Sequence, residues 1–288
     1  MKNILVTGAK GQLASEIKNL SKAGGDFKFF FLSKSHLDIT NKSQLENFFK
    51  KEKIDVLINC AAVSKPDKAA LDPDLANLLN NISVNTMANL ASEYGFIFIH
   101  VSTDFVFDGR KGRPYTEEDK VNPLSVYGVT KVNGEKAVQN SQAKSLIIRT
   151  SWLYSDKGTN FVKTILKLGK ERDSIKVISD QFGSPTYAKD LSNMILTILQ
   201  SSNLHKISSN KEILNFCNTG VCSWFDFAKE IIKVSNLNCS VIPCGTEEYS
   251  TPAVRPIYSA LDNSKICKMY NLQIPTWEES LKSFLKEY

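Results

Sequence analysis

The sequence lacks long apolar runs, clustered histidines and paired cysteine motifs, and each absence removes a class of protein. No stretch approaches the ~18 consecutive apolar residues of a membrane-spanning helix, so we expect no membrane partner. The apolar part of segment 2–7 is too short for a signal peptide, which favours a cytoplasmic location. The six cysteines show no Cys-x-x-Cys spacing and the three histidines are far apart, so we expect reduced thiols and no metal site built from them.

Clustered charge of one sign is also missing. The formal net charge is +6 over 288 residues, and lysines and arginines are interspersed with acids rather than gathered into a stripe. A nucleic-acid-binding surface needs such a cluster, so we expect no nucleic-acid partner. The mild positive excess suits an anionic small molecule such as a nucleotide.

What the chain does have is a regular alternation of short apolar strands with amphipathic helices up to about residue 150. Such alternation predicts βαβ units, and hence an α/β fold with a doubly wound, parallel, Rossmann-like sheet. The expected strands are 2–7, 27–32, 55–59, 96–102 and 145–150, and the expected helices are 12–22, 43–51, 74–94 and 127–140.

The rhythm becomes irregular after residue 150, where we expect helices only at 159–169, 190–199 and 224–234. We therefore predict a dinucleotide-binding domain at 1–150. Residues 151–288 would form mainly a smaller substrate-binding lobe, partly interleaved with the last strands of the sheet.

A glycine-containing loop, 8–14, joins the first predicted strand to the first predicted helix. Gly8 permits a tight turn, Gly11 lets the backbone approach a pyrophosphate, and Ala14 allows close packing of helix on strand. The helix N-terminus then offers unpaired N–H groups to the phosphates. An ordinary strand-to-helix turn is the alternative for this segment.

The end of the second predicted strand indicates which dinucleotide binds. An acidic residue there favours NAD, because it binds the ribose 2′-hydroxyl. Here the strand ends in Ser33, Lys34 and Ser35, whose hydroxyl and ammonium donors suit a 2′-phosphate. We therefore predict NADPH, with NADH as the alternative cofactor and a plain solvated turn as the alternative for these residues.

Three residues form a candidate catalytic group. Tyr127 and Lys131 are four residues apart, so they share one face of a helix, and a nearby ammonium can lower a phenol pKa from its usual value of about 10. Thr103 ends the fourth predicted strand, where its hydroxyl could bond a substrate carbonyl. The small residues Ala61 and Ala62, and Asn85 on the long helix, could line the cofactor, with a plain helix residue as the alternative for Asn85.

These segments resemble the extended short-chain dehydrogenase/reductase superfamily, and more narrowly the dTDP-4-dehydrorhamnose reductase family. The narrower resemblance is carried by 11–13, 37–40, 102–109, 122–128, 149–154, 180–186 and 255–262. It implies NADPH-dependent reduction of the C4 keto group of a nucleotide-linked 4-keto-6-deoxy sugar, most narrowly dTDP-4-dehydro-L-rhamnose to dTDP-L-rhamnose.

The resemblance also implies roles for individual residues. Tyr127 would donate a proton, Lys131 would bind the nicotinamide ribose and lower the pKa of Tyr127, and Thr103 would bond the sugar carbonyl. The remaining implied contacts are with the cofactor at Gln12, Leu13, Asp38, Ile39, Ala61, Ala62 and Val63, and with the sugar nucleotide at Asp104, Phe105 and Trp152. A core aromatic is the alternative for Trp152.

The sequence departs from the family pattern at a few positions. Lys65 and Pro66 replace the usual residues in a loop near the nicotinamide, and Cys60 stands where relatives tend to carry alanine. Some relatives hold Mg²⁺ with glutamates. Glu16 matches one of them, but Lys189 falls where an acid would be needed, so a Mg²⁺ site is doubtful.

Other functions remain open at this point. One is a reductase for a UDP- or GDP-linked keto sugar. Another is a non-enzymatic regulatory subunit resembling the methionine adenosyltransferase β subunit, which shares the tyrosine and lysine. A dehydratase is less favoured, because Phe105 follows Asp104 where a glutamate is needed. The sequence leaves the oligomeric state open, with a homodimer as one expectation.

Overall fold

A parallel sheet forms the centre of the protein. The computed structural model describes residues 1–22, 26–204, 207 and 211–288. In this part of the chain the sheet has six strands in the order β10-β5-β4-β3-β1-β2, all parallel to their neighbours. The strands are β1 (Lys2–Thr7), β2 (Phe27–Leu32), β3 (Val56–Asn59), β4 (Ile97–Thr103), β5 (Ser145–Thr150) and β10 (Glu212–Asn215). The predicted doubly wound parallel sheet is confirmed.

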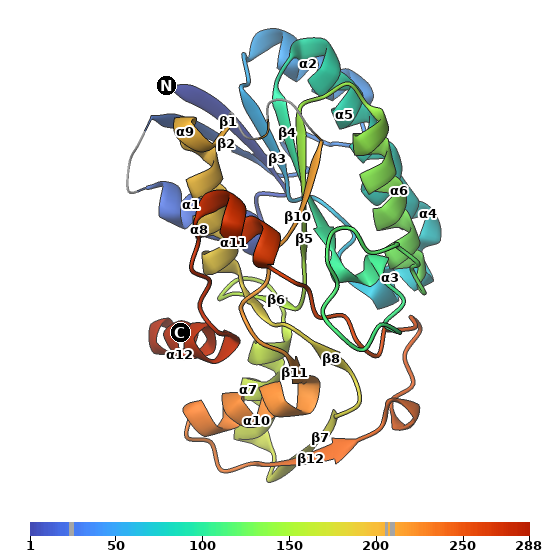
Figure 1. Cartoon of the computed structure of the whole chain (residues 1–288), viewed down its shortest axis with the longest axis vertical. Coiled ribbons are helices and arrows are strands. Elements are labelled where there is room, and N and C mark those ends of the chain that lie inside the picture. Colours follow the sequence, from blue (N-terminus) through green and yellow to red (C-terminus); the bar gives the residue numbers. More distant parts are fainter. Residues whose placement is uncertain (23–25, 205–206, 208–210) are drawn as a thin grey trace.

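Helices cover both faces of this sheet (Figure 1). Against one face pack α1 (Gln12–Ser21), α8 (Ala188–Leu199) and α11 (Ser264–Tyr270), and against the other pack α2 (Lys42–Lys51), α5 (Ser83–Tyr94) and α6 (Val126–Asn140). Each interface is a continuous apolar cluster of fully buried aliphatic and aromatic side chains. The strand order reverses between β1 and β3, and ligands bind at the carboxyl ends of the strands beside such a reversal in folds of this kind.

Several predicted strands have the same bounds as the observed ones, and other observed elements differ from the prediction or were not predicted. The strands 2–7, 27–32 and 145–150 are observed at those bounds. The predicted helix 74–94 is observed as a continuous helical segment that contains one wide turn: α4 (Pro73–Asn77), the π-type turn η1 (Leu78–Ile82) and then α5. Asp72 caps α4 through the N–H of Leu75. Four observed elements were not predicted from the sequence: α3 (Pro66–Leu71), the edge strand β10, α11 and α12 (Trp277–Glu287).

The lower part of the molecule is built from helices and short strand pairs (Figure 1). Its helices are α7 (Phe161–Glu171), α10 (Trp224–Val234) and α12, which share one apolar cluster around the fully buried Phe227. The strand pairs are β6 (Leu153–Tyr154) with β9 (Thr186–Tyr187), β7 (Ser174–Ile178) with β12 (Ser240–Cys244), and β8 (Phe182–Gly183) with β11 (Cys222–Ser223). Shorter helical pieces are η2 (Asp104–Val106), α9 (Ser201–Leu204) and η4 (Thr246–Glu248).

The second half of the chain contributes to both parts. β10 pairs with β5, and α8 and α11 pack on the sheet, although all three follow residue 150. The division into a domain at 1–150 and a lobe at 151–288 stays a prediction. Among the described residues, which include all six cysteines, every thiol is free, and no helix is long and apolar enough to cross a membrane.

Candidate active site

The loop between β1 and α1 is shaped to receive a phosphate group. Gly8 has a φ of +67°, and a Cβ added there would lie 2.8 Å from the backbone nitrogen of Ala61, so a larger residue would clash. The N–H of Gly11 donates to the Gly8 carbonyl at 2.8 Å. Gly11 caps α1 without any side-chain hydrogen bond, so the first N–H groups of the helix remain available. The residues present fit a dinucleotide pyrophosphate.

The side chains of the next two residues, Gln12 and Leu13, have different environments. Gln12 reaches across to the lower part of the molecule: its Oε1 accepts from Asn160 Nδ2 at 2.8 Å, and its Nε2 donates to the Leu153 carbonyl at 3.3 Å. Leu13 points into the core and is 4% exposed. A contact of Leu13 with the cofactor would therefore come from its backbone.

The loop after β2 holds the residues expected at the adenosine end. Ser33 Oγ lies 2.9 Å from both Ser35 Oγ and His36 Nδ1. The Lys34 side chain is 77% exposed and pairs loosely with Asp38 at 3.8 Å, so its ammonium can turn toward an incoming phosphate. Ile39 is buried beside them. This arrangement suits a 2′-phosphate better than a bare 2′-hydroxyl.

A buried asparagine, Asn80, which was not predicted from the sequence, holds the loop after β3. Asn80 Oδ1 accepts from the N–H of Val63 at 2.9 Å, while its Nδ2 donates to the Val63 carbonyl at 3.1 Å and to Thr130 Oγ1 at 3.2 Å. This clamp fixes the backbone that carries Ala61, Ala62 and Val63. An asparagine among the apolar positions of the helix 74–94 was the available signal.

Asn85, by contrast, does not reach the site. Its side chain lies on the exposed face of α5, where Asn89 Nδ2 approaches its Oδ1 at 3.5 Å. Asn80, within the wide turn η1, is buried and faces inward, whereas Asn85, five residues later, is exposed. The expectation that Asn85 lines the cofactor is corrected accordingly.

Thr103, Asp104 and Tyr127 meet at the carboxyl end of β4. Thr103 Oγ1 donates to Asp104 Oδ1 at 3.0 Å and accepts from the N–H of Phe105 at 3.3 Å. The ring of Phe105 lies edge-on to that of Tyr127, with centroids 5.5 Å apart. Gly128 makes this contact possible, since a Cβ there would lie 2.3 Å from the Phe105 carbonyl oxygen.

The pKa values of Tyr127 and Asp104 both lie above their usual values. Burial raises the pKa of Tyr127 to about 12, a hydrogen bond with Thr103 opposes the shift, and the Asp104 carboxylate adds to it. Burial also raises the pKa of Asp104 to about 6, against hydrogen bonds from Ser259 and Thr103. The phenol therefore keeps its proton at neutral pH, as a proton donor must.

Lys131 is buried, and its amine contacts β4. Its Nζ donates to the Val101 carbonyl at 2.6 Å and lies 3.3 Å from His100 Nε2. Burial lowers the pKa of Lys131 to about 8, while Glu135 and Cys60 oppose the shift. The causes of the Tyr127 pKa shift in this structure are burial, Thr103 and Asp104, and the expectation that Lys131 lowers the pKa of Tyr127 stays a prediction.

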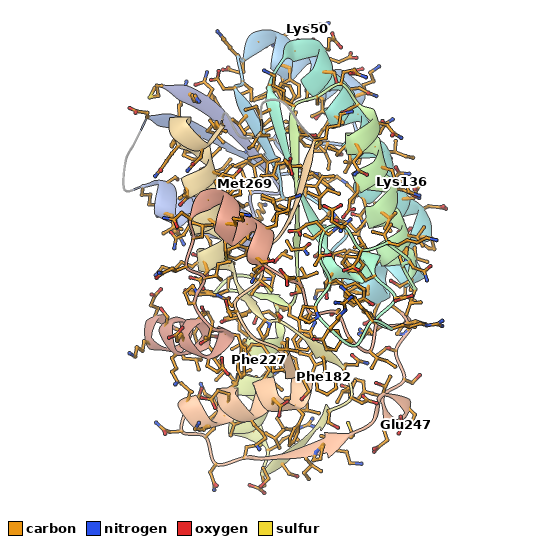
Figure 2. All side chains as sticks on the ribbon, viewed as in Figure 1. Lys50, Lys136, Phe182, Phe227, Glu247 and Met269 are labelled. Carbon is orange, nitrogen blue, oxygen red and sulfur yellow. The ribbon has the colours of Figure 1, made fainter. Side chains whose placement is uncertain are left out.

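Helix α6, which carries Tyr127 and Lys131, is fixed to the sheet by a buried ion pair. Arg149 on β5 donates from Nε and Nη2 to the two carboxylate oxygens of Glu135, at 3.0 Å and 2.7 Å. Ser102 Oγ donates to the same carboxylate at 2.5 Å. On the outer face of the helix, Lys136 extends into solvent (Figure 2). The ion pair thus sets the orientation of the inner, catalytic face.

Trp152 lies where the sheet passes into the lower part of the molecule. Its ring stacks on Trp224 with centroids 3.4 Å apart, and a Cβ added to Gly183 would lie 2.5 Å from its other side. The backbone of Trp152 is in the left-handed region, at a φ of +46°. The ring is a partly buried member of the lower core, and its contact with a substrate stays a prediction.

The loop that departs from the family pattern is well anchored. Pro66 occupies the first turn of α3, Lys65 Nζ donates to Thr159 Oγ1 at 2.8 Å, and Asp67 pairs with Arg255 at 2.7 Å. Cys60 is adjacent, and burial raises the pKa of its thiol to about 12, so it remains protonated.

The residues considered for Mg²⁺ lie elsewhere, around a hollow of about 270 Å³ lined by Glu16, Asp156, Lys189 and Glu287, among others. Lys189 Nζ donates to Glu287 at 2.6 Å. Burial, and then Asp156, raise the pKa of Glu16. Within the described ranges no group of three or more histidine, cysteine or acidic side chains is arranged to hold a metal ion. The residues present do not fit Mg²⁺, because an ammonium occupies the position of a ligand.

Comparison with known proteins places the chain in a family. The family model described as "RmlD substrate binding domain" matches residues 1–288. The dTDP-4-dehydrorhamnose reductase of Aggregatibacter actinomycetemcomitans is 37% identical, over 98% of this chain and 98% of its own.

Two crystal structures are also close. A dTDP-4-dehydrorhamnose reductase from Clostridium acetobutylicum is 40% identical over 99% of both chains, with a TM-score of 0.92. That from Bacillus anthracis, in complex with NADP, is 37% identical over 100% of both chains, with a TM-score of 0.93. The agreement in sequence and structure extends over the whole chain, which therefore belongs to the RmlD substrate-binding-domain family.

Proposed function

We propose that the protein is an NADPH-dependent reductase that converts dTDP-4-dehydro-L-rhamnose to dTDP-L-rhamnose. The observation that carries this proposal is the contact of Thr103 with Tyr127 at the carboxyl end of β4, with Lys131 one turn further along α6. The N-terminus of α1, which has no side-chain cap, follows β1 at the same edge of the sheet. The relatives of matching length are named as reductases of this kind, which supports the same substrate.

The chemistry divides between the cofactor and the side chains. Bound NADPH would supply a hydride to the C4 keto carbon. Tyr127 would then transfer its phenolic proton to the oxygen that becomes the hydroxyl, leaving a phenolate. Thr103 would hold that oxygen in place, since its hydroxyl already lies at the phenol. The high pKa of Tyr127 keeps the proton available until the oxygen becomes basic.

Cofactor choice rests on the adenosine end. Lys34 supplies a mobile ammonium and Ser33 a hydroxyl, and neither carries the negative charge that would repel a 2′-phosphate. The NADP in the Bacillus anthracis neighbour supports the same preference. NADH is the weaker alternative. A cytoplasmic location and a homodimer stay predictions.

A substrate panel tests the proposal. We expect NADPH oxidation, followed at 340 nm, with the dTDP-linked 4-keto-6-deoxy sugar and slower turnover with UDP- or GDP-linked analogues. Preference for a UDP- or GDP-linked sugar would replace the substrate while keeping the reaction.

The non-enzymatic alternative needs a second experiment. A protein resembling a regulatory subunit would show no turnover on any sugar and would be recovered with a stoichiometric partner in a pull-down. That pair of results would overturn the reductase proposal.

A further inference from the structure

A line of buried polar side chains runs through the sheet from β1 to α6. Thr7, Asn59, His100 and Lys131 are each at most 2% exposed. Thr7 Oγ1 donates to Asn59 Oδ1 at 2.6 Å, Asn59 Nδ2 lies 3.2 Å from His100 Nδ1, and His100 Nε2 lies 3.3 Å from Lys131 Nζ. The line ends at the amine that the proposed reaction uses. The proposed chemistry assigns no role to the histidine.

The hydrogen-bond donors and acceptors along this line determine how the Asn59 amide is oriented and which nitrogen of His100 carries the proton. Asn59 Oδ1 accepts both from Thr7 and from the N–H of Ala61 at 3.3 Å, so the amide nitrogen of Asn59 must face His100. That nitrogen can only donate, which makes Nδ1 of His100 an acceptor without a proton. Burial, with Lys131 nearby, holds the pKa of His100 well below its usual value, so the ring is neutral. Its single proton is therefore on Nε2 and points at Lys131.

The amine of Lys131, when neutral, complements this tautomer of His100. One of its hydrogens goes to the Val101 carbonyl at 2.6 Å. A neutral amine also has a lone pair that can accept from His100 Nε2–H. An ammonium has no lone pair and would set an N–H against an N–H.

Resting on the proposed function, we propose that His100 is a positioning residue: it holds the Lys131 amine at the end of β4 and favours its neutral form. His100 thereby limits the pH range over which Lys131 carries a proton. This range matters because an ammonium at Lys131 would stabilise the phenolate left on Tyr127 after proton transfer.

The other charged and titratable groups around Lys131 come from several elements. Glu135 on α6 favours the ammonium, but Arg149 and Ser102 already bond its carboxylate. Cys60, after β3, holds its thiol proton. Tyr127 lies one turn earlier on α6, and the Asp104 carboxylate acts on Tyr127. In the described part of the chain, the hydrogen bonds of Lys131 Nζ go to Val101 and His100.

The sign of the effect follows from burial and this contact together. The pKa of Lys131 is lowered to about 8, so its proton is present below that pH and is lost as the pH rises through it. Replacing His100 by a residue that can offer Lys131 an acceptor favours the ammonium. The proton is then kept to higher pH.

The tautomer can be measured directly on the unliganded protein. The chain has three histidines, so ¹⁵N-histidine NMR gives few signals, and His36→Gln and His100→Gln assign two of them. At about pH 9, where Lys131 is mostly neutral, we expect His100 protonated on Nε2 and not on Nδ1. A proton on Nδ1 at this pH overturns the proposal. This measurement requires neither cofactor nor substrate, so inactivity on the sugar panel alongside the expected tautomer counts against the proposed function alone.

A variant tests the consequence. In His100→Gln, whose side-chain oxygen can accept from Lys131, we expect the alkaline limb of NADPH binding and of kcat/KM to move up by about half a pH unit or more. An unchanged limb in a folded variant overturns the proposal. A purely structural role for His100 would lower stability without moving the limb. If His100→Gln fails to fold, the NMR measurement on the unmodified protein still decides.

Discussion

At the carboxyl edge of the sheet, side chains are held by hydrogen bonds between buried polar groups, whereas the lower part of the molecule holds its side chains by stacked rings. The edge contains Asn59, Asn80, His100 and the Glu135–Arg149 pair, each with fixed partners. The lower part contains ring stacks such as Trp152 on Trp224 and Tyr154 on Tyr187, at 3.4 Å and 5.5 Å.

Hydrogen bonds and ring stacks constrain side chains in different ways. A hydrogen bond specifies a direction and a proton, so it can orient a reacting group and set its charge. A ring stack supplies buried area and a loose geometric preference, so it maintains the shape of a surface. The chain uses the first kind around Tyr127 and Lys131, the proposed catalytic residues, and the second in the part for which we predict sugar-nucleotide binding.

The largest effect should come from removing the one proton that moves. Tyr127→Phe keeps the ring against Phe105 and loses the hydroxyl, so kcat should fall by about 10²–10⁴. NADPH affinity, measured by its fluorescence, should hardly change. Full activity in this variant would place the acid elsewhere.

A second test removes one partner of the buried ion pair. Arg149→Met leaves the Glu135 carboxylate buried without its partner and should cost about 3–5 kcal/mol in the free energy of unfolding, measured in urea. Lys42→Met, which removes an exposed pair with Glu46, is the control and should change little. Equal effects would mean that burial is not what makes the edge sensitive.

The ring-stacked region should respond more mildly. Gly183→Ala places a methyl group against Trp152 and should cost about 1–3 kcal/mol in the same measurement. We also expect a higher KM for the sugar nucleotide with kcat nearly unchanged, since the ring would be displaced and not removed. Val221→Ala, at an exposed position in the same region, is the control. An unaltered KM would argue that Trp152 is a core residue alone.

The smallest effect concerns an exposed polar contact. Lys34→Ala should reduce the ratio of kcat/KM for NADPH over NADH about tenfold, or about 1.4 kcal/mol, because only the 2′-phosphate distinguishes the two cofactors. Lys50→Ala, which removes an exposed lysine in the last turn of α2, serves as the control. If the unmodified protein used NADPH and NADH equally well, the role given to Lys34 would be wrong.

The comparison also explains what the sequence could predict. Strands 2–7, 27–32 and 145–150 carry the continuous apolar pattern of a buried parallel sheet, which is a local signal. The strands β6, β8, β9 and β11 are two residues long, too short for any periodicity, and they form because distant segments meet. β10 is a four-residue strand whose partner, β5, is distant in the sequence.

The site shows the same limit. The spacing of Tyr127 and Lys131 predicted a shared helix face, and α6 is observed there. The direction of the Lys131 amine depends on His100 and Val101, which lie about 30 residues earlier on another element. Asn85 was named from its place on the long helix alone, which does not fix which face its side chain takes, and the side chain is exposed.

The pairing of β10 with β5 has a consequence for synthesis of the chain. Residues 146–149 are matched by residues 212–215, so β5 has an open edge until the ribosome has passed the middle of the second half. An unpaired, apolar strand edge is a template for association with other chains. A chain ending near residue 150 would keep that edge, and we expect it to aggregate. The nascent chain therefore carries an unpaired β5 edge until β10, the sixth strand of the sheet, has been synthesised.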